Sequence, residues 1–412
     1  MASPEITLEA VPSVTDIPAA EWDACANPAG DPNSLEHLDT LAAGGAQGEP
    51  CKPAYNPFVS HAFFAAAEAS GSACARTGWG GRHLLARLDG KIAGIVPCYL
   101  KSHSQGEYVF DRGWADAYER AGGRYYPKLQ ASVPFTPATG PRLLIRDGVD
   151  REQIGTALAS GLMALCNATN ASSVHVTFAR EAEAKFLGAH GFLQRNDQQF
   201  HWHNAGYGSF DDFLTSLNSR HRKAIKRERR EALSAGITIH HLTGADITEE
   251  AWDAFFAFYM ETGSRKWGRP YLTRKFFSLI GESMSRDVLL VMAKRNGRWI
   301  AGAINFIGSD TLFGRNWGAV EHHPFLHFEV CYYQAIDFAI QRGLKIVEAG
   351  AQGEHKLARG YLPQTTYSAH FIADPDLRRA IADYLKRERA YVAEVGRELA
   401  ESGPFRKAAD EA

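Results

Sequence analysis

Alternating apolar and polar positions predict two similar β-hairpins. One spans His83–Leu100, HLLARLDGKIAGIVPCYL, and the other spans Val288–Gly308, VLLVMAKRNGRWIAGAINFIG. The first run is broken by Asp-Gly and the second by Asn-Gly, dipeptides that favour the tight turns of hairpins. Both second strands contain Ile-Ala-Gly, and a helix-like segment with paired phenylalanines precedes each hairpin. The chain therefore contains an internal repeat.

A second pair of segments repeats in the same order. His175–Trp202 and Lys345–Phe371 each read as a strand, a short helix, a Gly-aromatic-Leu step and a closing strand. The spacing between the copies is unequal, which indicates an insertion in the first copy, within Ser102–Arg146. We predict two copies of one mixed α/β unit, with residues 1–206 forming the first domain and residues 207–412 the second.

Periodicity in the second copy predicts a three-stranded meander followed by a helix and two further strands. The predicted strands are Ile237–Leu242, Val288–Arg295, Arg298–Ile307, Thr311–Trp317, Lys345–Ala349 and Thr366–Ile372. The predicted helices are Ser209–Leu217, Ser219–Ala235, Thr248–Arg265, Thr273–Met284, Phe328–Arg342 and Asp376–Glu401.

Several stretches of the chain resemble one protein family. PFTPATGPRLL, HRKAIKRERRE, GRNWGA and EAGAQGEHKLARGY are similar to the Fem-like, GNAT-superfamily group of N-acyltransferases described by peptidoglycan biosynthesis or recognition. The resemblance extends from about Asn56 to the last helix. It implies an α/β (α+β) fold of tandem GNAT-like acyl-CoA N-acyltransferase domains, each a mixed, mostly antiparallel sheet flanked by helices.

One departure from the GNAT pattern bears on the acyl donor. The usual pyrophosphate loop, Gln/Arg-x-x-Gly-x-Gly/Ala, is replaced before the Phe328 helix by GAVEHHPFLHFEV. Fem proteins also lack this loop and use aminoacyl-tRNA. The resemblance thus leaves acyl-CoA and charged tRNA open as donor substrates, and no cofactor is expected to be bound permanently.

The composition of the chain limits the kinds of binding partner that we expect. The 412 residues carry a net charge of −2, whereas a dedicated DNA-binding domain is usually basic throughout. The six cysteines are scattered without zinc spacing, so no metal site is expected, and the simplest interpretation is reduced thiols in a cytoplasm. We see neither a signal peptide nor a run of about 20 apolar residues. These features predict a cytoplasmic protein with at most peripheral membrane contact.

Candidate chemistry concentrates in EAGAQGEHKLARGY, which follows an apolar strand. Acyl transfer to an amine needs a base, and an anionic donor needs cations. Glu348, Glu354 and His355 are the candidate bases in this run. Four further residues of the run are candidates for binding the donor: Gln352, Gly353, Lys356 and Arg359. The alternative is an exposed loop with solvated charges.

The preceding strand and helix add further candidates. Arg315 and Trp317 should lie on one face of the strand, with Asn316 on the other. Arg315 favours a bound phosphate or carboxylate, with an internal salt bridge as the alternative. His327 is a candidate catalytic residue at the helix start, whereas Cys331 is better explained as a structural cysteine than as a nucleophile.

Residues outside this region are less decisive. Arg220, Lys223, Arg227 and Arg230 recur at helical spacing and form one basic stripe, suited to phosphate or to a solvated surface. Thr136, Thr139 and Arg142 lie in a proline-containing loop that closes the cleft or is merely inserted. The first copy offers five residues for a facing wall, of which Phe178 and Trp202 fit core packing better: His175, Phe178, Gln199, His201 and Trp202.

The main hypothesis is an N-acyltransferase that moves an acyl group from a carrier, most simply acyl-CoA, to an amine of the cell envelope or of a lipid. The nearest alternative is transfer from charged tRNA to a peptidoglycan precursor. A third hypothesis is a binding module that keeps the Fem architecture and recognises an envelope precursor or RNA without turnover. All three need two neighbouring strands of the second copy to diverge and leave a slot for the ligand.

Overall fold

The two predicted hairpins form in the computed structural model, which describes residues 5–28, 55–267, 270–350 and 353–406. Strand β3 (His83–Leu88) pairs with β4 (Lys91–Val96), and β11 (Val288–Arg295) pairs with β12 (Arg298–Ile307). The first hairpin is shorter than the predicted His83–Leu100, because the chain is interrupted at Pro97. Strand β5 (Cys98–Lys101) joins the large sheet, whereas β3 and β4 belong to a separate four-stranded sheet. Both residues of each turn have positive φ, 48° and 81° at Asp89-Gly90 and 48° and 77° at Asn296-Gly297. These values match the left-handed turns for which Asp-Gly and Asn-Gly are favoured.

The remaining elements follow the predicted order closely. The other strands are β1 (Ile6–Val11), β2 (Trp79–Gly81), β5 (Cys98–Lys101), β6 (Lys128–Ala131), β7 (Leu144–Ile145), β8 (Ser173–Ala179), β9 (Leu193–His203), β10 (Thr238–Thr243), β13 (Thr311–Ala319), β14 (Ile346–Glu348) and β15 (Leu362–Ile372). The helices of the first half are α1 (Ala19–Ala26), α3 (His61–Ala69), α4 (Arg112–Arg120), α5 (Arg151–Ala168) and α6 (Glu181–Ala189). Those of the second half are α7 (Phe210–Ser216), α8 (Ser219–Ala232), α9 (Glu249–Trp267), α10 (Arg274–Met284), α11 (Leu326–Phe328), α12 (Gln334–Gln341) and α13 (Pro375–Glu401).

One helix differs from its prediction. The single helix expected at Phe328–Arg342 begins at Leu326 and contains a π-helical turn at Glu329–Tyr333 before α12. A π turn inserts an extra residue into the helix and often marks a functional site.

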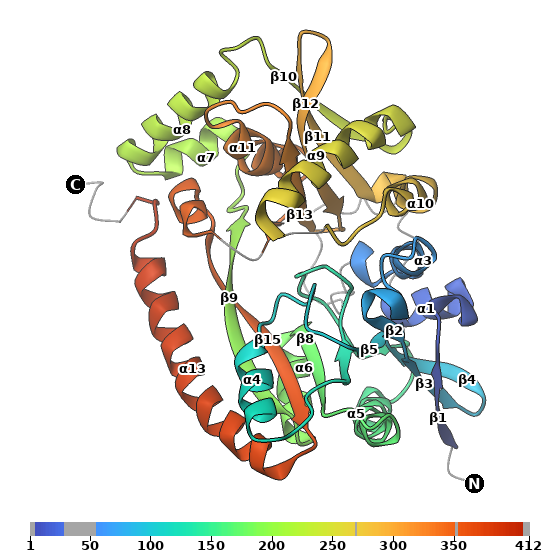
Figure 1. Cartoon of the computed structure of the whole chain (residues 1–412). Helices are drawn as coiled ribbons and strands as arrows, with labels where there is room; N and C mark the ends of the chain where they lie inside the picture. Colours follow the sequence, from blue (N-terminus) through green and yellow to red (C-terminus); the bar gives the residue numbers. More distant parts are fainter. Residues whose placement is uncertain (1–4, 29–54, 268–269, 351–352, 407–412) are drawn as a thin grey trace.

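The two halves exchange their last strands. The large sheet has the order β10-β11-β12-β13-β14-β9-β15-β8-β6-β5-β2. Strand β9 of the first half therefore pairs with β14 of the second, and β15 of the second half pairs with β8 of the first. In Figure 1 these two long strands run between the lower and upper parts of the molecule. The sequence break near residue 207 is thus not a break in the sheet.

Helices cover both faces of the second half of the sheet. On β11, Leu290 and Met292 pack toward α9, α10 and α3, whereas Leu289 and Val291 pack toward α7, α8 and α12. This alternation has the period of two that a strand buried on both faces requires. The α9–α10 face and the α12 face are therefore distinct sides of one sheet.

Strands β13 and β14 diverge after a short parallel pairing. They pair only at Thr311–Phe313 with Ile346–Glu348. We call the gap that follows, between Gly314–Trp317 and Ala349–Gly350, the second fork, because it lies in the second half of the chain. This short pairing confirms that the two strands diverge, as the predicted slot for a ligand requires.

Candidate functional site

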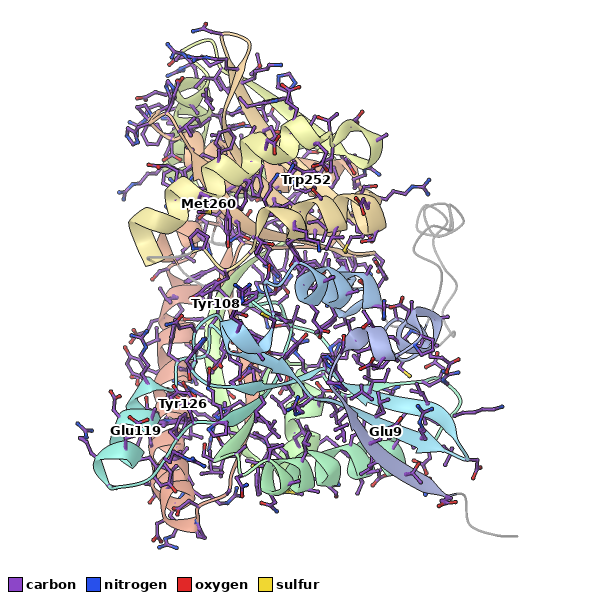
Figure 2. The ribbon with its side chains drawn as sticks, turned by 45° about the vertical axis from the view of Figure 1, so that its right-hand side comes forward. Glu9, Tyr108, Glu119, Tyr126, Trp252 and Met260 are labelled. Atoms are coloured by element: carbon purple, nitrogen blue, oxygen red, sulfur yellow. The ribbon has the colours of Figure 1, made fainter. Side chains whose placement is uncertain are left out.

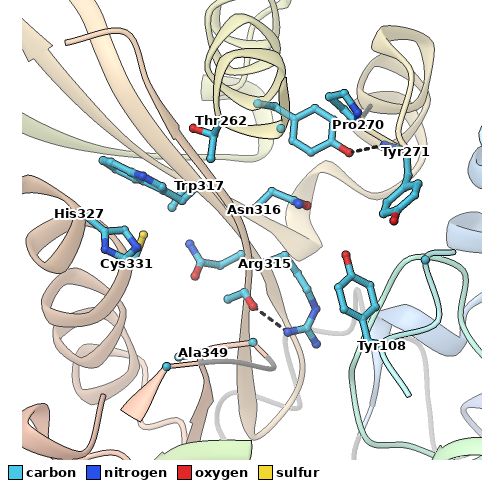
Figure 3. A pocket seen from close by; sticks show the side chains of 18 of the residues that line it. Tyr108, Thr262, Pro270, Tyr271, Arg315, Asn316, Trp317, His327, Cys331 and Ala349 are labelled. Atoms are coloured by element: carbon cyan, nitrogen blue, oxygen red, sulfur yellow. Dashed lines mark hydrogen bonds between the residues drawn. The ribbon is translucent and has the colours of Figure 1, made fainter. Parts of the chain in front are cut away.

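A cavity of about 600 Å³ occupies the second fork. It draws residues from both faces of the sheet, because Tyr259 and Tyr271 belong to the α9–α10 side and Cys331 and Tyr332 to the α12 side. Figure 3 shows this arrangement, with His327 and Cys331 on one side of β13 and Tyr108 and Tyr271 on the other. The cavity has the size of a site for a small molecule or for the reactive end of a larger one.

The fork is opened by glycine and by a β-bulge. A Cβ on Gly314 would lie 3.1 Å from the Glu348 carbonyl oxygen, so the strands separate at a point where a side chain fits poorly. Next to it, Arg315 and Asn316 together oppose the single residue Ile304 of β12. A bulge of this kind bends the strand and re-aims its side chains.

The bulge corrects one prediction. Arg315 and Trp317 were expected on one face, but the Arg315 guanidinium lies over the Phe58 ring on the side of α3 and α9. Trp317 instead packs on the α12 side, beside His327. Strict alternation holds only for a regular strand, and the extra residue breaks it. Gly314, a glycine inside the strand pattern, was the available signal for this bulge.

Arg315 forms the internal salt bridge that the sequence left as its alternative. Its Nη2 lies 3.5 Å from Glu348 Oε2, and both side chains are almost completely buried. Burial raises the pKa of Glu348 to about 7, although Arg315 acts in the opposite direction. Burial likewise lowers the pKa of Arg315. The long contact leaves Arg315 Nε and Nη2 and Glu348 Oε2 without hydrogen-bond partners, so the pair is poorly satisfied.

An aromatic cluster forms the end of the cavity beside α11 and α12. The His327 ring lies 5.2 Å from that of Trp317 and 6.2 Å from that of His355. His355 Nε2 is 2.9 Å from the Tyr332 hydroxyl, within hydrogen-bond distance. Gly353 also lines the cavity, and its φ of 115° favours glycine. Of the predicted site residues, the structure brings Arg315, Trp317, His327, Gly353 and His355 together here.

Two predicted cations point elsewhere. Lys356 is buried, and its Nζ donates to the Gly350 carbonyl at 2.9 Å. Burial lowers the pKa of Lys356 to about 7. Arg359 donates to both Glu228 oxygens, at 2.9 and 3.0 Å, and its guanidinium lies 3.4 Å from the Phe328 ring centre. Neither lines the cavity, because the 3₁₀ turn at Glu354–Arg359 directs both side chains into internal contacts.

The remaining predicted residues lie in different parts of the molecule, and the side chains of two of them are not described. Gln352 and the Glu354 side chain lie outside the described residues. Arg220 and Lys223 are exposed on α8 and do not line the cavity. Glu348 lines a second cavity of about 370 Å³, together with His201 and His203. Cys331 is half-buried and lines the main cavity, which is more than the structural role expected of it.

The facing wall differs from the sequence prediction. His175 lies in a buried polar cluster, with its Nδ1 2.8 Å from His370 Nδ1, and does not line the main cavity. Phe178 and Trp202 are buried, as core packing predicted. The wall is instead made by Ser104–Arg112, a segment from the expected insertion.

This segment holds residues that the sequence argument missed. Tyr108 has a φ of 61°, a conformation that bulky residues rarely adopt, and Figure 2 shows it between the upper and lower parts of the molecule. Asp111 and Arg112 also line the cavity, and Tyr271 comes from the segment between α9 and α10. A clustering of Tyr, Phe, Asp and Arg in SQGEYVFDRG was the available signal, but nothing local links that stretch to the second fork.

The sequence of the chain matches one known protein family. The family model FemAB-like, described as peptidoglycan biosynthesis/recognition, matches residues 13–407. The chain belongs to this family. The family description associates the chain with peptidoglycan biosynthesis or recognition. No curated protein gives a significant match to the sequence.

Solved structures with a similar chain path are distant in sequence. FemX is 13% identical, with a TM-score of 0.49 over 76% of this chain and 93% of FemX. A tandem GNAT protein from the clavulanic acid biosynthesis pathway is 12% identical, with a TM-score of 0.43 over 90% of this chain and 99% of that one. L-PGS from Bacillus licheniformis is 9% identical, with a TM-score of 0.45 over 71% and 86%.

Within residues 5–28, 55–267, 270–350 and 353–406, no group of three or more His, Cys, Asp or Glu side chains is arranged to hold a metal ion. In the same ranges, no helix combines the length and apolar character needed to cross a membrane.

Proposed function

We propose that this Fem-like protein transfers an acyl group from an activated carrier, acyl-CoA in the first instance, to an amine acceptor of the cell envelope. The proposal rests on the cavity in the second fork, which is lined by residues from both faces of one sheet. A donor entering beside α12 and an acceptor entering beside α9 and α10 would meet at Gly314–Trp317. Holding two reactants in one orientation supplies much of the rate enhancement of a transfer reaction.

The fork also supplies chemistry. Beyond Phe313 and Glu348 the facing strand edges are no longer paired with each other. The carbonyl groups of Gly314 and Gly350 accept hydrogen bonds from Arg315 and Lys356 instead. Backbone N–H groups at such an edge stabilise the negative charge that develops on the acyl oxygen during attack by an amine. The amine nitrogen forms the new bond to the acyl carbon, and the carrier thiol leaves.

Two residues are candidates for accepting the proton of the attacking amine. Glu348 lies at the tip of the fork and lines the second cavity rather than the main one. Burial raises its pKa to about 7, the range in which a carboxylate is an effective base at neutral pH. His327 lines the cavity at its α11 end. E348Q and H327A separate the two, because removal of the base lowers turnover and abolishes the acidic limb of its pH profile.

Transfer from charged tRNA is the second candidate. The observation that favours it is the exposed basic face of α8, which includes Arg220, Lys223, Arg227 and Arg230. Rows of exposed cations bind nucleic-acid phosphates with a strong dependence on salt. Helix α8 contacts the Glu354–Arg359 turn and α11, both of which contribute residues to the cavity.

The test supplies both donors to the purified chain. CoA thioesters of increasing acyl length and tRNA charged with radiolabelled amino acids are each incubated with L-lysine methyl ester, which carries two amines, with simple alkylamines and with a peptidoglycan pentapeptide precursor. Release of free CoA with formation of an amide supports the first candidate, and transfer of label supports the second. Tight binding of donor and acceptor without any product would overturn both in favour of a recognition module.

A further inference from the structure

A buried cluster of charged side chains lies directly behind the wall Ser104–Arg112. Lys128 is buried and donates to Glu107 Oε2 at 2.7 Å and to Asp111 Oδ2. The Tyr125 hydroxyl donates to the same Asp111 oxygen at 2.8 Å. A second lysine, Lys101, is 3.8 Å from Glu107 Oε1. The cluster thus contains two carboxylates and two ammonium groups away from water.

The cluster is short of hydrogen-bond donors. Neither Glu107 Oε1 nor Asp111 Oδ1 accepts a hydrogen bond, although both are buried. Burial lowers the pKa of Lys101 to about 7, so its charge is only partly present at neutral pH. Buried carboxylate oxygens without donors are costly and uncommon, and such groups often mark the place of a ligand.

Asp111 alone of these carboxylates reaches the cavity. Asp111 belongs to the wall of the cavity and is 2% exposed, whereas Glu107 does not contribute to the lining. Burial opposes its charge, yet Lys128 and His175 hold the pKa of Asp111 well below its usual range. Ser104, which also lines the cavity, lowers the pKa of Asp111 further through a hydrogen bond to its carboxylate. That contact is too long to count as an ordinary hydrogen bond, and Asp111 Oδ1 has no partner at normal distance.

We propose that the Asp111 carboxylate binds a positively charged ammonium group of the acceptor, at the end of the cavity opposite His327. This inference rests on the proposed transfer reaction, because it assigns the acceptor to this end. Asp111 stays ionised and is a poor proton acceptor. The ammonium that it holds therefore remains protonated and anchors the acceptor, while a different amine attacks the acyl carbon.

The other charges around the cavity agree with this assignment. Arg315 is paired with Glu348. Arg112 lines the cavity but is exposed, so water and salt screen its charge. The aromatic side chains of Tyr108, Phe110 and Tyr271 line the same end and suit the carbon chain of an alkylammonium group. The acceptor class is thus a compound with a flexible aliphatic amine beside its reacting one.

The experiment measures binding rather than turnover. Nα-acetyl-L-lysine methyl ester and its uncharged counterpart, Nα-acetyl-L-norleucine methyl ester, are titrated into the full-length chain by calorimetry at pH 7. We expect the lysine ester to bind at least about tenfold tighter, in line with a hydrogen bond to a charged group. D111N should bind the two esters equally.

Matched variants separate recognition from loss of the fold. E107Q disturbs the same lysines without touching the cavity and should keep the preference for the lysine ester. If D111N fails to fold, D111N/K101M removes one carboxylate and one lysine and keeps the Lys128–Glu107 pair, so the buried cluster stays balanced in charge and should fold. Preservation of the preference in D111N or in D111N/K101M would overturn the proposal, as would its loss in E107Q.

The result is independent of acyl transfer. Binding of the lysine ester that depends on Asp111, with no product from any donor, would leave this recognition site standing and remove the proposed function. Acyl transfer by the wild type with an unchanged ester preference in D111N would do the reverse.

Discussion

The two halves of the chain contain the same fork in two different states. Strand β6 pairs in parallel with β8 over three residues, Leu129–Ala131, just as β13 pairs with β14 over three. We call the gap that follows β6 and β8 the first fork. Beyond the pairing, Gly140 N donates to the Phe178 carbonyl at 3.0 Å and Arg142 Nε donates to the Thr177 carbonyl at 2.9 Å. The chain itself thus caps the exposed edge of β8.

This comparison shows what the insertion does. Residues from the proline-containing loop fill the first fork, and the buried Arg142 also donates to the carbonyls of Ala138 and Pro141. The second fork has no such loop among its described neighbours, and a cavity lies there instead. One copy has become a structural support, while the other retains space for a ligand. The same short parallel pairing can therefore support the fold or a binding site, depending on whether other residues fill the fork beyond it.

The largest expected effect comes from emptying the first fork. R142M leaves two buried carbonyl groups and one partly buried one without donors. It should lower the free energy of unfolding by about 3–5 kcal/mol, since each buried group costs about 1–3 kcal/mol. The matched variant R315M in the second fork should cost less than about 2 kcal/mol, because Glu348 can become neutral by protonation. Urea denaturation of both proteins measures the difference, and equal losses would contradict the contrast between the forks.

Stability should also depend on pH through Glu348. Its folded pKa of about 7 lies above the ordinary value of 4.5, so the folded state binds the proton more tightly than the unfolded state. The resulting stabilisation is complete below about pH 4.5 and is lost as pH rises toward 7, an effect of roughly 3 kcal/mol by the cost of one pKa unit.

Urea denaturation of the wild type and of E348Q at several pH values tests this sign. The wild type should lose stability relative to E348Q between pH 5 and pH 8. A constant difference across that range would show that Glu348 titrates normally and is charged throughout.

Filling the second fork should remove activity without unfolding the protein. A349L places a larger side chain at the cavity wall and should reduce turnover about 100-fold, the order expected when reactants are displaced by about 1 Å. The same change in β8, A179L, enlarges a fully buried residue and should instead cost about 1–3 kcal/mol of stability. Steady-state assays and thermal melts on both variants distinguish the two forks; retained turnover in A349L would show that the ligand does not enter there.

The smallest effect on stability is expected from the α8 stripe. Replacement of Arg220, Lys223, Arg227 and Arg230 by alanine should change the unfolding free energy by less than about 0.5 kcal/mol per residue, because all four are exposed. The same fourfold variant identifies which donor reaches the second fork. With charged tRNA, binding should weaken and its salt dependence should fall; with acyl-CoA of short chain, turnover should be nearly unchanged.

The sequence by itself determined the elements and their order. Alternation with Asp-Gly and Asn-Gly turns gave both hairpins, and helical periodicity gave α9, α10 and α13 to within a few residues. These features are local, because each depends on neighbouring residues and their own backbone preferences. The run after β14 was also rightly singled out, since His355 and Gly353 reach the cavity.

Only the tertiary structure decided which residues share the cavity. The exchange of β9 and β15, the bulge at Arg315 and Asn316, and the inward turn of Lys356 and Arg359 depend on partners far away in the chain. The wall containing Asp111 reaches the second fork because the two halves pack together across more than 150 residues of sequence, which no local pattern records. Periodicity fixes which face a residue occupies in a regular element, whereas packing fixes what stands opposite that face.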